Sequence, residues 1–117
     1  MIYDNIPGID AKKAFDLYED AEDVFLAVLR SWVSDASAYI VKLRNVSAET
    51  LKDYAVSIHG LKGTSAGIGA ESIREKAKEL EMMAKAGNLT GIQAENESFL
   101  KQVDSQVKVI QNWLSKK

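Results

Sequence analysis

His59 is the only histidine in the 117-residue chain, which contains no cysteine. A neutral imidazole nitrogen is a nucleophile near pH 7, so His59 is the residue best suited to bond to an electrophile. The lack of cysteine excludes disulfides, thiolate catalysis and cysteine-based metal sites. A lone histidine on a helix is nevertheless most often structural or simply solvated. Its surroundings must therefore decide between a chemical and a structural role.

The stretch around His59 differs from the rest of the chain in its charge. Residues 54–70, YAVSIHGLKGTSAGIGA, contain one charged side chain, Lys62, whereas a chain that is 27% charged would place about four to five there. The stretch contains no acidic residue at all. Such a surface is suited to bind an anion and to contact a partner protein.

The same stretch has glycines where its apolar spacing predicts a continuing helix. Gly60 and Gly63 lie inside that helix, and each interior glycine costs about 1 kcal/mol relative to alanine. Helical side chains lean toward the N-terminus, so a side chain at position 63 would lean over the imidazole of His59. Glycine leaves that approach open. The alternative is a helix end with Gly60 as its C-cap, which the helical register of the apolar residues beyond it opposes.

A phosphoryl group is an anion that fits these features. On the ring of His59 it would carry close to two negative charges, which Lys62, one helical turn away, could partly offset. The sequence shows no other part of a phosphoryl-transfer machine, so a partner must bring the metal ion and the remaining stabilisation. The residues alone leave this interpretation and a structural role for His59 equally open.

The elements that must position these residues are helices. Pro7 is the only proline, apolar residues recur at three- and four-residue spacing, and no strand-like alternation competes. We expect five helices, over residues 10–18, 20–43, 47–67, 70–87 and 90–114. The expected N-caps are Asp10, Asp20 and Ser47, with a capping box at Thr90 and Gln93. This pattern predicts an all-α fold: an antiparallel four-helix bundle with a short additional N-terminal helix.

Length and composition predict one soluble domain. The chain is 46% hydrophobic with a net charge of −2, and single cores commonly occupy roughly 100–150 residues. We expect one domain over residues 1–117, with a lead-in at 1–9 and a helical bundle at 10–117. Scattered basic residues argue against nucleic-acid binding. The longest apolar run, residues 24–29, is far short of the ~20 residues of a membrane span, and no signal peptide is recognisable. We expect a cytoplasmic monomer.

Residues 59–70, HGLKGTSAGIGA, resemble the signature of histidine-containing phosphotransfer (HPt) domains, roughly H-x-L-K-G-x-[SA]-x-x-[IL]-G-A. Ala77, Leu80 and Glu81 resemble the family's A-x-x-L-E helix, and residues 7–10, PGID, resemble a lead-in seen before many of these domains. The resemblance therefore covers essentially the whole chain. One departure is Gly60, where the family more often has threonine, alanine or serine.

The resemblance implies a carrier in the phosphorelays of bacterial two-component signal transduction. His59 would accept the phosphoryl group through Nε2, Lys62 would stabilise that group, and Gly63 would give the partner's active site access. The partner would be a response-regulator receiver domain that binds Mg²⁺ and donates or accepts through its aspartate. A histidine kinase is a second candidate partner. The chain itself would bind no metal or cofactor and would not be an autonomous enzyme.

Other classes fit less well. The phosphotransfer domain of a chemotaxis-type kinase shares the H-x-x-K-G core, although the length and the lead-in favour a relay module, either stand-alone or part of a hybrid kinase. A kinase dimerisation helix pair usually has an acid and a proline where Gly60 and Thr64 stand. A di-metal bundle enzyme needs two Glu-x-x-His pairs, which one histidine cannot supply. A purely structural bundle would leave the grouping of His59, Lys62 and Gly63 unexplained.

Overall fold

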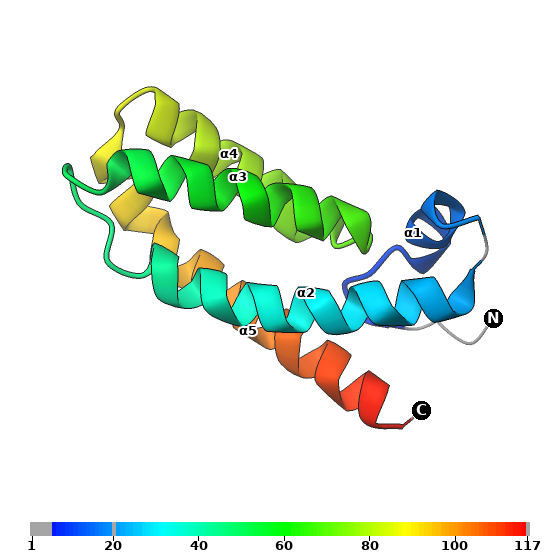
Figure 1. The fold of residues 1–117 in the computed structure, drawn as a ribbon. Helices are drawn as coiled ribbons and strands as arrows, with labels where there is room; N and C mark the ends of the chain where they lie inside the picture. Colours follow the sequence, from blue (N-terminus) through cyan, green and yellow to red (C-terminus); the bar gives the residue numbers. More distant parts are fainter. Residues whose placement is uncertain (1–5, 20, 117) are drawn as a thin grey trace.

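The computed structural model describes residues 6–19 and 21–116, which form helices and, over those residues, no strand. The helices are α1 (Ala11–Leu17), α2 (Glu22–Leu43), α3 (Leu51–Gly67), α4 (Glu71–Lys85) and α5 (Leu89–Ser115) (Figure 1). The prediction of an all-α fold is confirmed.

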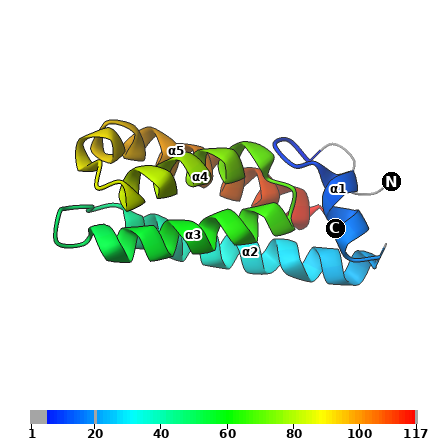
Figure 2. The same cartoon turned by 90° about the horizontal axis from the view of Figure 1, so that it is seen from above.

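The four long helices pack around one core. α2 contacts α3 and α5, and α4 contacts the same two helices, so the contacts form a closed ring. Figures 1 and 2 show the chain reversing direction from each long helix to the next. The short α1 packs against α2 and α3, at the end of the bundle where α2 begins (Figure 2). The molecule is elongated, with extents of 44 × 24 × 18 Å.

Apolar residues at helical spacing turn one face of each long helix to this core, as the sequence pattern predicted. The largest fully buried side chains are Trp32, Phe25, Phe99, Leu29, Leu43, Ile58, Leu61, Ile68, Ile73, Leu80, Ile92 and Ile110. Burial of each such side chain contributes roughly 1.5–3 kcal/mol, so the core is what holds α3 in register with its neighbours.

Buried polar side chains tie α3 to α2 and α5 as well. The indole Nε1 of Trp32 donates to the hydroxyl of Ser65 at 3.1 Å. The hydroxyl of Tyr54 donates to Oδ1 of Asn96 at 2.8 Å, and the amide of Asn96 donates to the carbonyl of Leu43 at 2.8 Å. Because these groups are buried, each depends on its partner. These bonds therefore set how α3 is rotated and placed along the bundle.

Of the three expected N-caps, two can be compared directly with the structure. Asp10 caps α1, because its side chain accepts a hydrogen bond from the backbone N–H of Lys13 at 3.1 Å. Asp20, the expected cap of the second helix, lies outside the described residues. The expected cap at Ser47 is wrong: its hydroxyl accepts from the N–H of Thr50 in a preceding turn, and Thr50 occupies the N-cap position of α3.

The expected capping box of the last helix is also wrong. α5 begins at Leu89, and the side chain of Asn88 accepts a hydrogen bond from the N–H of Gly91 at 2.9 Å. Thr90 and Gln93 therefore lie within the first turns of the helix. Gly87, with φ +72°, ends α4 directly before this cap, so the turn between α4 and α5 is tighter than expected.

The C-terminal end of α3 is held by α1 and by its own cap. Gly69 has φ +76°, and the N–H of Ala70 donates back to the carbonyl of Ser65 at 2.9 Å, as in a Schellman cap. The carbonyl of Gly69 accepts from the N–H of Asp10 at 2.8 Å, and the hydroxyl of Tyr18 donates to the carbonyl of Gly67 at 2.7 Å. The helix that carries His59 is thus anchored at its end.

One helix in the described part of the chain, α2, is long and apolar enough to cross a membrane by length and composition. Its most apolar window has a mean hydropathy of 1.4. This is a weak indication, because the core helix of a soluble protein satisfies the same criteria. In this structure α2 contributes Phe25, Leu29 and Trp32 to the core of the bundle.

Candidate functional site

His59 lies in the middle of α3, and its ring faces solvent on the side toward α4. Its side chain is 66% exposed, so the ring lies outside the buried apolar stripe of α3. Nδ1 of the ring is 2.7 Å from Oε2 of Glu81 on α4. Glu81 itself is only 4% exposed. Residues 54–70 contain no acid, so the carboxylate that contacts His59 comes from the neighbouring helix α4.

Two lysines also contact the carboxylate of Glu81. Nζ of Lys62 donates to Oε1 at 2.6 Å, and Nζ of Lys85 lies 3.4 Å from Oε2. The hydrogen bond from Lys62, with smaller contributions from His59 and Lys85, lowers the pKa of Glu81 from 4.5 to about 2 against the opposing effect of burial. Glu81 is therefore ionised at neutral pH.

The ionised carboxylate fixes the tautomer of a neutral His59. A carboxylate can only accept hydrogen bonds, so Nδ1 of the ring must be the donor in its 2.7 Å contact with Glu81. A neutral imidazole has one protonated nitrogen, and the lone pair then lies on Nε2. The geometry thus makes Nε2 the nucleophilic atom of the ring.

Lys62 lies one turn beyond His59 on α3, as its spacing predicted, but its ammonium is directed to Glu81. Its side chain is 28% exposed and hydrogen-bonded at 2.6 Å. Removing it would leave a buried carboxylate short of a partner, which is costly. Lys62 therefore stabilises the carboxylate of Glu81, which in turn holds the ring of His59.

Gly60 and Gly63, two of the three glycines of α3, have different surroundings. A Cβ atom at Gly63 would meet nothing within 4 Å, so no packing in the described chain requires glycine there. A Cβ atom at Gly60 would lie 2.3 Å from the hydroxyl of Tyr39 on α2. Gly60 therefore permits close packing of α3 against α2, and the alternative of a C-cap at Gly60 is wrong because α3 continues to Gly67.

The sequence analysis missed the roles of Glu81, Lys85 and Tyr39. Glu81 was noted there only as part of a family pattern. The available signal was its register: Glu81 comes four residues after the buried Ala77, so an acid stands on the apolar stripe of its helix. Lys85 stands four residues after Glu81, so their ion pair follows from helical spacing once Glu81 is placed at the site. Tyr39 gave no such signal, because its contact with Gly60 crosses from α2 to α3.

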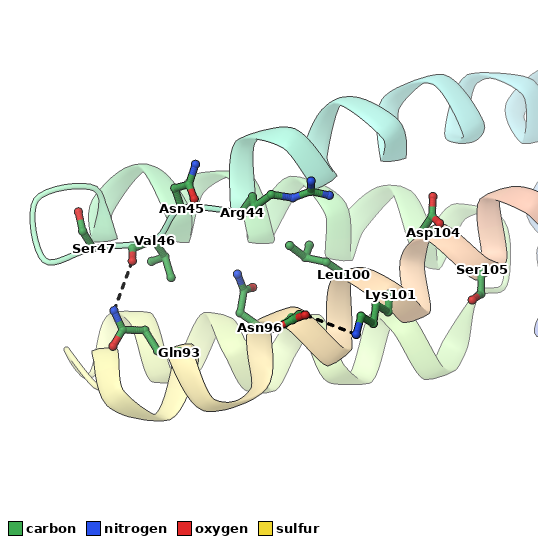
Figure 3. Close-up of a pocket in the computed structure, with 11 residues that line it drawn as sticks. Arg44, Asn45, Val46, Ser47, Gln93, Asn96, Leu100, Lys101, Asp104 and Ser105 are labelled. Carbon is green, nitrogen blue, oxygen red and sulfur yellow. Dashed lines mark hydrogen bonds and ion pairs between the residues drawn. The ribbon is translucent and has the colours of Figure 1, made fainter.

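A groove in the described part of the chain lies away from His59. It has a volume of about 1000 Å³ and lies between the C-terminal end of α2, the following loop and the first half of α5. Figure 3 shows Asn96 and Leu100 along α5 facing Arg44, Asn45 and Val46 across it. His59 is not part of this groove. Among the described residues, no group of three or more histidine, cysteine or acidic side chains could hold a metal ion.

Comparison with known proteins gives a family for the chain. The chain matches the Hpt domain family over residues 26–114. This range takes in α3 and α4, and so includes the sequence around His59 and Glu81. Neither the curated proteins nor the solved structures gave a match. Since the family match spans most of the chain, the protein belongs to the Hpt domain family, whose members carry phosphoryl groups on histidine in two-component signal transduction.

Proposed function

We propose that this protein is a phosphorelay carrier that accepts a phosphoryl group on Nε2 of His59 and exchanges it with the aspartate of a response-regulator receiver domain. The observation that carries the proposal is the pairing of His59 with Glu81. It holds Nδ1 as a donor in a 2.7 Å hydrogen bond while the ring remains 66% exposed. A partner can therefore approach Nε2 from solvent, on a helix that the bundle holds in place.

The transfer is a displacement at phosphorus. The lone pair of Nε2 forms the N–P bond, the P–O bond to the partner's aspartate breaks, and the aspartate leaves as a carboxylate. The imidazole gains positive charge as the N–P bond forms, because its Nδ1 keeps its proton. The Glu81 carboxylate, 2.7 Å from Nδ1, stabilises that charge where it develops. The reverse displacement returns the phosphoryl group to an aspartate.

The remaining roles follow from this assignment. Lys62 keeps Glu81 ionised and adds positive charge beside the phosphoryl group. Gly63 leaves the approach to the ring open. The receiver domain contributes the Mg²⁺ ion, so the chain would act as a carrier without catalysis of its own. We place this exchange in the bacterial cytoplasm, on a monomeric antiparallel four-helix bundle.

The proposal is tested with a receiver domain whose aspartate carries a radioactive phosphoryl group. Incubation without ATP should transfer label to the protein, and the label should be acid-labile and alkali-stable, as expected of an N–P bond. His59→Gln should accept no label and should keep the helical circular dichroism of the wild type. Label retained on that variant would refute the assignment. Labelling only by a kinase catalytic domain with ATP would favour the chemotaxis-type alternative instead.

A further inference from the structure

The charged groups around His59 do not balance before phosphorylation. Glu81 brings one negative charge, whereas Lys62 and Lys85 each bring a positive charge, and both contact its carboxylate. A phosphoryl group on the ring would add between one and two negative charges. One lysine is enough to neutralise the carboxylate of Glu81, so the second is available to pair with an incoming anion.

Lys85 is close enough to His59 to meet that anion. It is the last residue of α4, one turn beyond Glu81. Its Nζ and Nδ1 of His59 contact the same oxygen, Oε2 of Glu81, at 3.4 and 2.7 Å, which puts the two nitrogens within about 6.1 Å of each other. The stem of a lysine is flexible, so rotation about its side-chain bonds can carry its ammonium from Oε2 toward a group attached to the ring.

The two lysines differ in how firmly Glu81 holds them. Lys62 makes the shorter contact, 2.6 Å, and its side chain is 28% exposed, whereas Lys85 stands at 3.4 Å and is 69% exposed. An exposed i, i+4 ion pair contributes little stability and is easily exchanged. Lys85 can thus leave Glu81 at small cost, while Lys62 continues to neutralise the buried carboxylate.

We infer that Lys85 stabilises the phosphoryl group on His59, by moving from Oε2 of Glu81 to a phosphoryl oxygen when the ring is phosphorylated. Lys62 stays on Oε1 and keeps Glu81 in place beneath Nδ1. The inference rests on the proposed function, because it concerns the phosphorylated state of the same ring. It extends the site by a residue from α4 that lies outside the motif on α3.

The experiment compares Lys85→Gln with Lys85→Arg and with a matched control, Lys101→Gln. Lys101 also makes an i, i+4 ion pair at 3.4 Å, with Glu97, and is 77% exposed, but it lies on α5 away from His59. Each variant is incubated with the phosphorylated receiver domain. Three quantities are measured: the labelled fraction at equilibrium, the lifetime of the label after the receiver is removed, and the ³¹P chemical shift of phosphohistidine as a function of pH.

Lys85→Gln should still be labelled on His59, but the equilibrium constant for transfer from the receiver should fall about five-fold, the size of effect expected for one exposed ion pair. The ³¹P titration should shift to higher pH, because the nearby positive charge that favours the dianion is lost. Lys85→Arg should restore both, and Lys101→Gln should match the wild type in all three measurements. Thermal unfolding of each variant separates these effects from loss of fold.

A Lys85→Gln variant that matches Lys101→Gln in labelled fraction, lifetime and ³¹P titration would overturn the inference about Lys85. That result would leave the proposed function intact as long as His59→Gln accepts no label. Labelling of His59→Gln would instead overturn the proposed function itself. The two failures are therefore distinguishable with the same set of proteins.

Discussion

At the scale of single residues, the site divides into groups that share a helix and groups that meet across helices. His59, Lys62 and Gly63 lie on α3, where the helical repeat relates their positions, so their proximity could be predicted from spacing alone. Glu81 and Lys85 come from α4. The ion pair between Glu81 and Lys85 follows from their i, i+4 spacing within α4. The contacts of Glu81 with His59 and Lys62 depend instead on how α3 and α4 are rotated against each other, which the whole core decides. The sequence therefore indicated His59 as the candidate nucleophile but did not indicate the carboxylate that contacts it.

The lowered pKa of Glu81 predicts a pH dependence of stability. In the folded state this pKa is about 2, against a usual 4.5, so the ion pairs of Glu81 contribute full stability above about pH 4.5. That contribution is lost as the pH falls toward 2, where the folded state also takes up the proton. Glu81→Gln should lower the free energy of unfolding at pH 7 by up to about 3 kcal/mol, since one pKa unit corresponds to about 1.4 kcal/mol.

Urea denaturation of both proteins at pH 7, 5, 4 and 3 checks this prediction, with tryptophan fluorescence as the probe. The difference between wild type and Glu81→Gln should be constant above pH 5 and should narrow as the pH falls below it. Glu79→Gln is the control on the same helix, because Glu79 is 61% exposed and pairs with Lys76 alone. A difference that does not change between pH 7 and pH 3 would contradict the assigned cause.

At the scale of elements, the helices were predictable and some of their starts were not. The apolar repeat located all five helices, because each must turn one face to the core. Ser47 and Thr50 are both good N-cap residues one turn apart, and propensity does not choose between them. The packing of Leu51 and the residues after it against the bundle decides where α3 begins. Likewise, the sequence gives no reason for a glycine at position 60 in the interior of a helix. The reason is the side chain of Tyr39 on α2, which lies against Gly60.

Gly60 and Gly63 give a matched pair that tests this difference. Gly63→Ala should stabilise the protein by up to about 1 kcal/mol, the difference in helix propensity, because its Cβ meets nothing within 4 Å. Gly60→Ala adds a Cβ 2.3 Å from the hydroxyl of Tyr39, so the ring must move and the gain in propensity should be cancelled or reversed.

The measurement is the urea midpoint of each variant alone and combined with Tyr39→Ala. In the absence of the tyrosine ring, Gly60→Ala should become as favourable as Gly63→Ala. Equal stabilisation by the two alanines in the presence of Tyr39 would show that the ring does not require glycine at position 60.

At the scale of the whole molecule, the site depends on polar contacts far from it. Asn96 is 5% exposed and joins three long helices, through the hydroxyl of Tyr54 on α3 and the carbonyl of Leu43 at the end of α2. Apolar side chains tolerate small rotations of one helix against another, whereas these hydrogen bonds do not. They help to fix the rotation of α3 that brings His59 to Glu81. Sequence patterns could place Asn96 on α5 but could not name its partners.

Asn96→Leu should therefore destabilise the protein by about 2–4 kcal/mol, because a buried hydroxyl and a buried carbonyl both lose their partner. The free energy of unfolding in urea checks this value. Gln93→Ala is the control, since Gln93 lies one turn earlier on α5 and makes only a long, exposed hydrogen bond of 3.5 Å to Val46. A loss no larger than that of the control would show that the buried network adds nothing to stability.

The exposure of His59 has a consequence for how long a signal lasts. The ring is 66% exposed, and it does not line the groove between α2 and α5. A phosphoryl group on the ring would be exposed to bulk water between encounters. Its retention would then depend on how slowly water attacks the N–P bond. Under the proposed function, the duration of the signal would depend on how often a receiver domain meets the carrier, and the cell would tune it through receiver concentration.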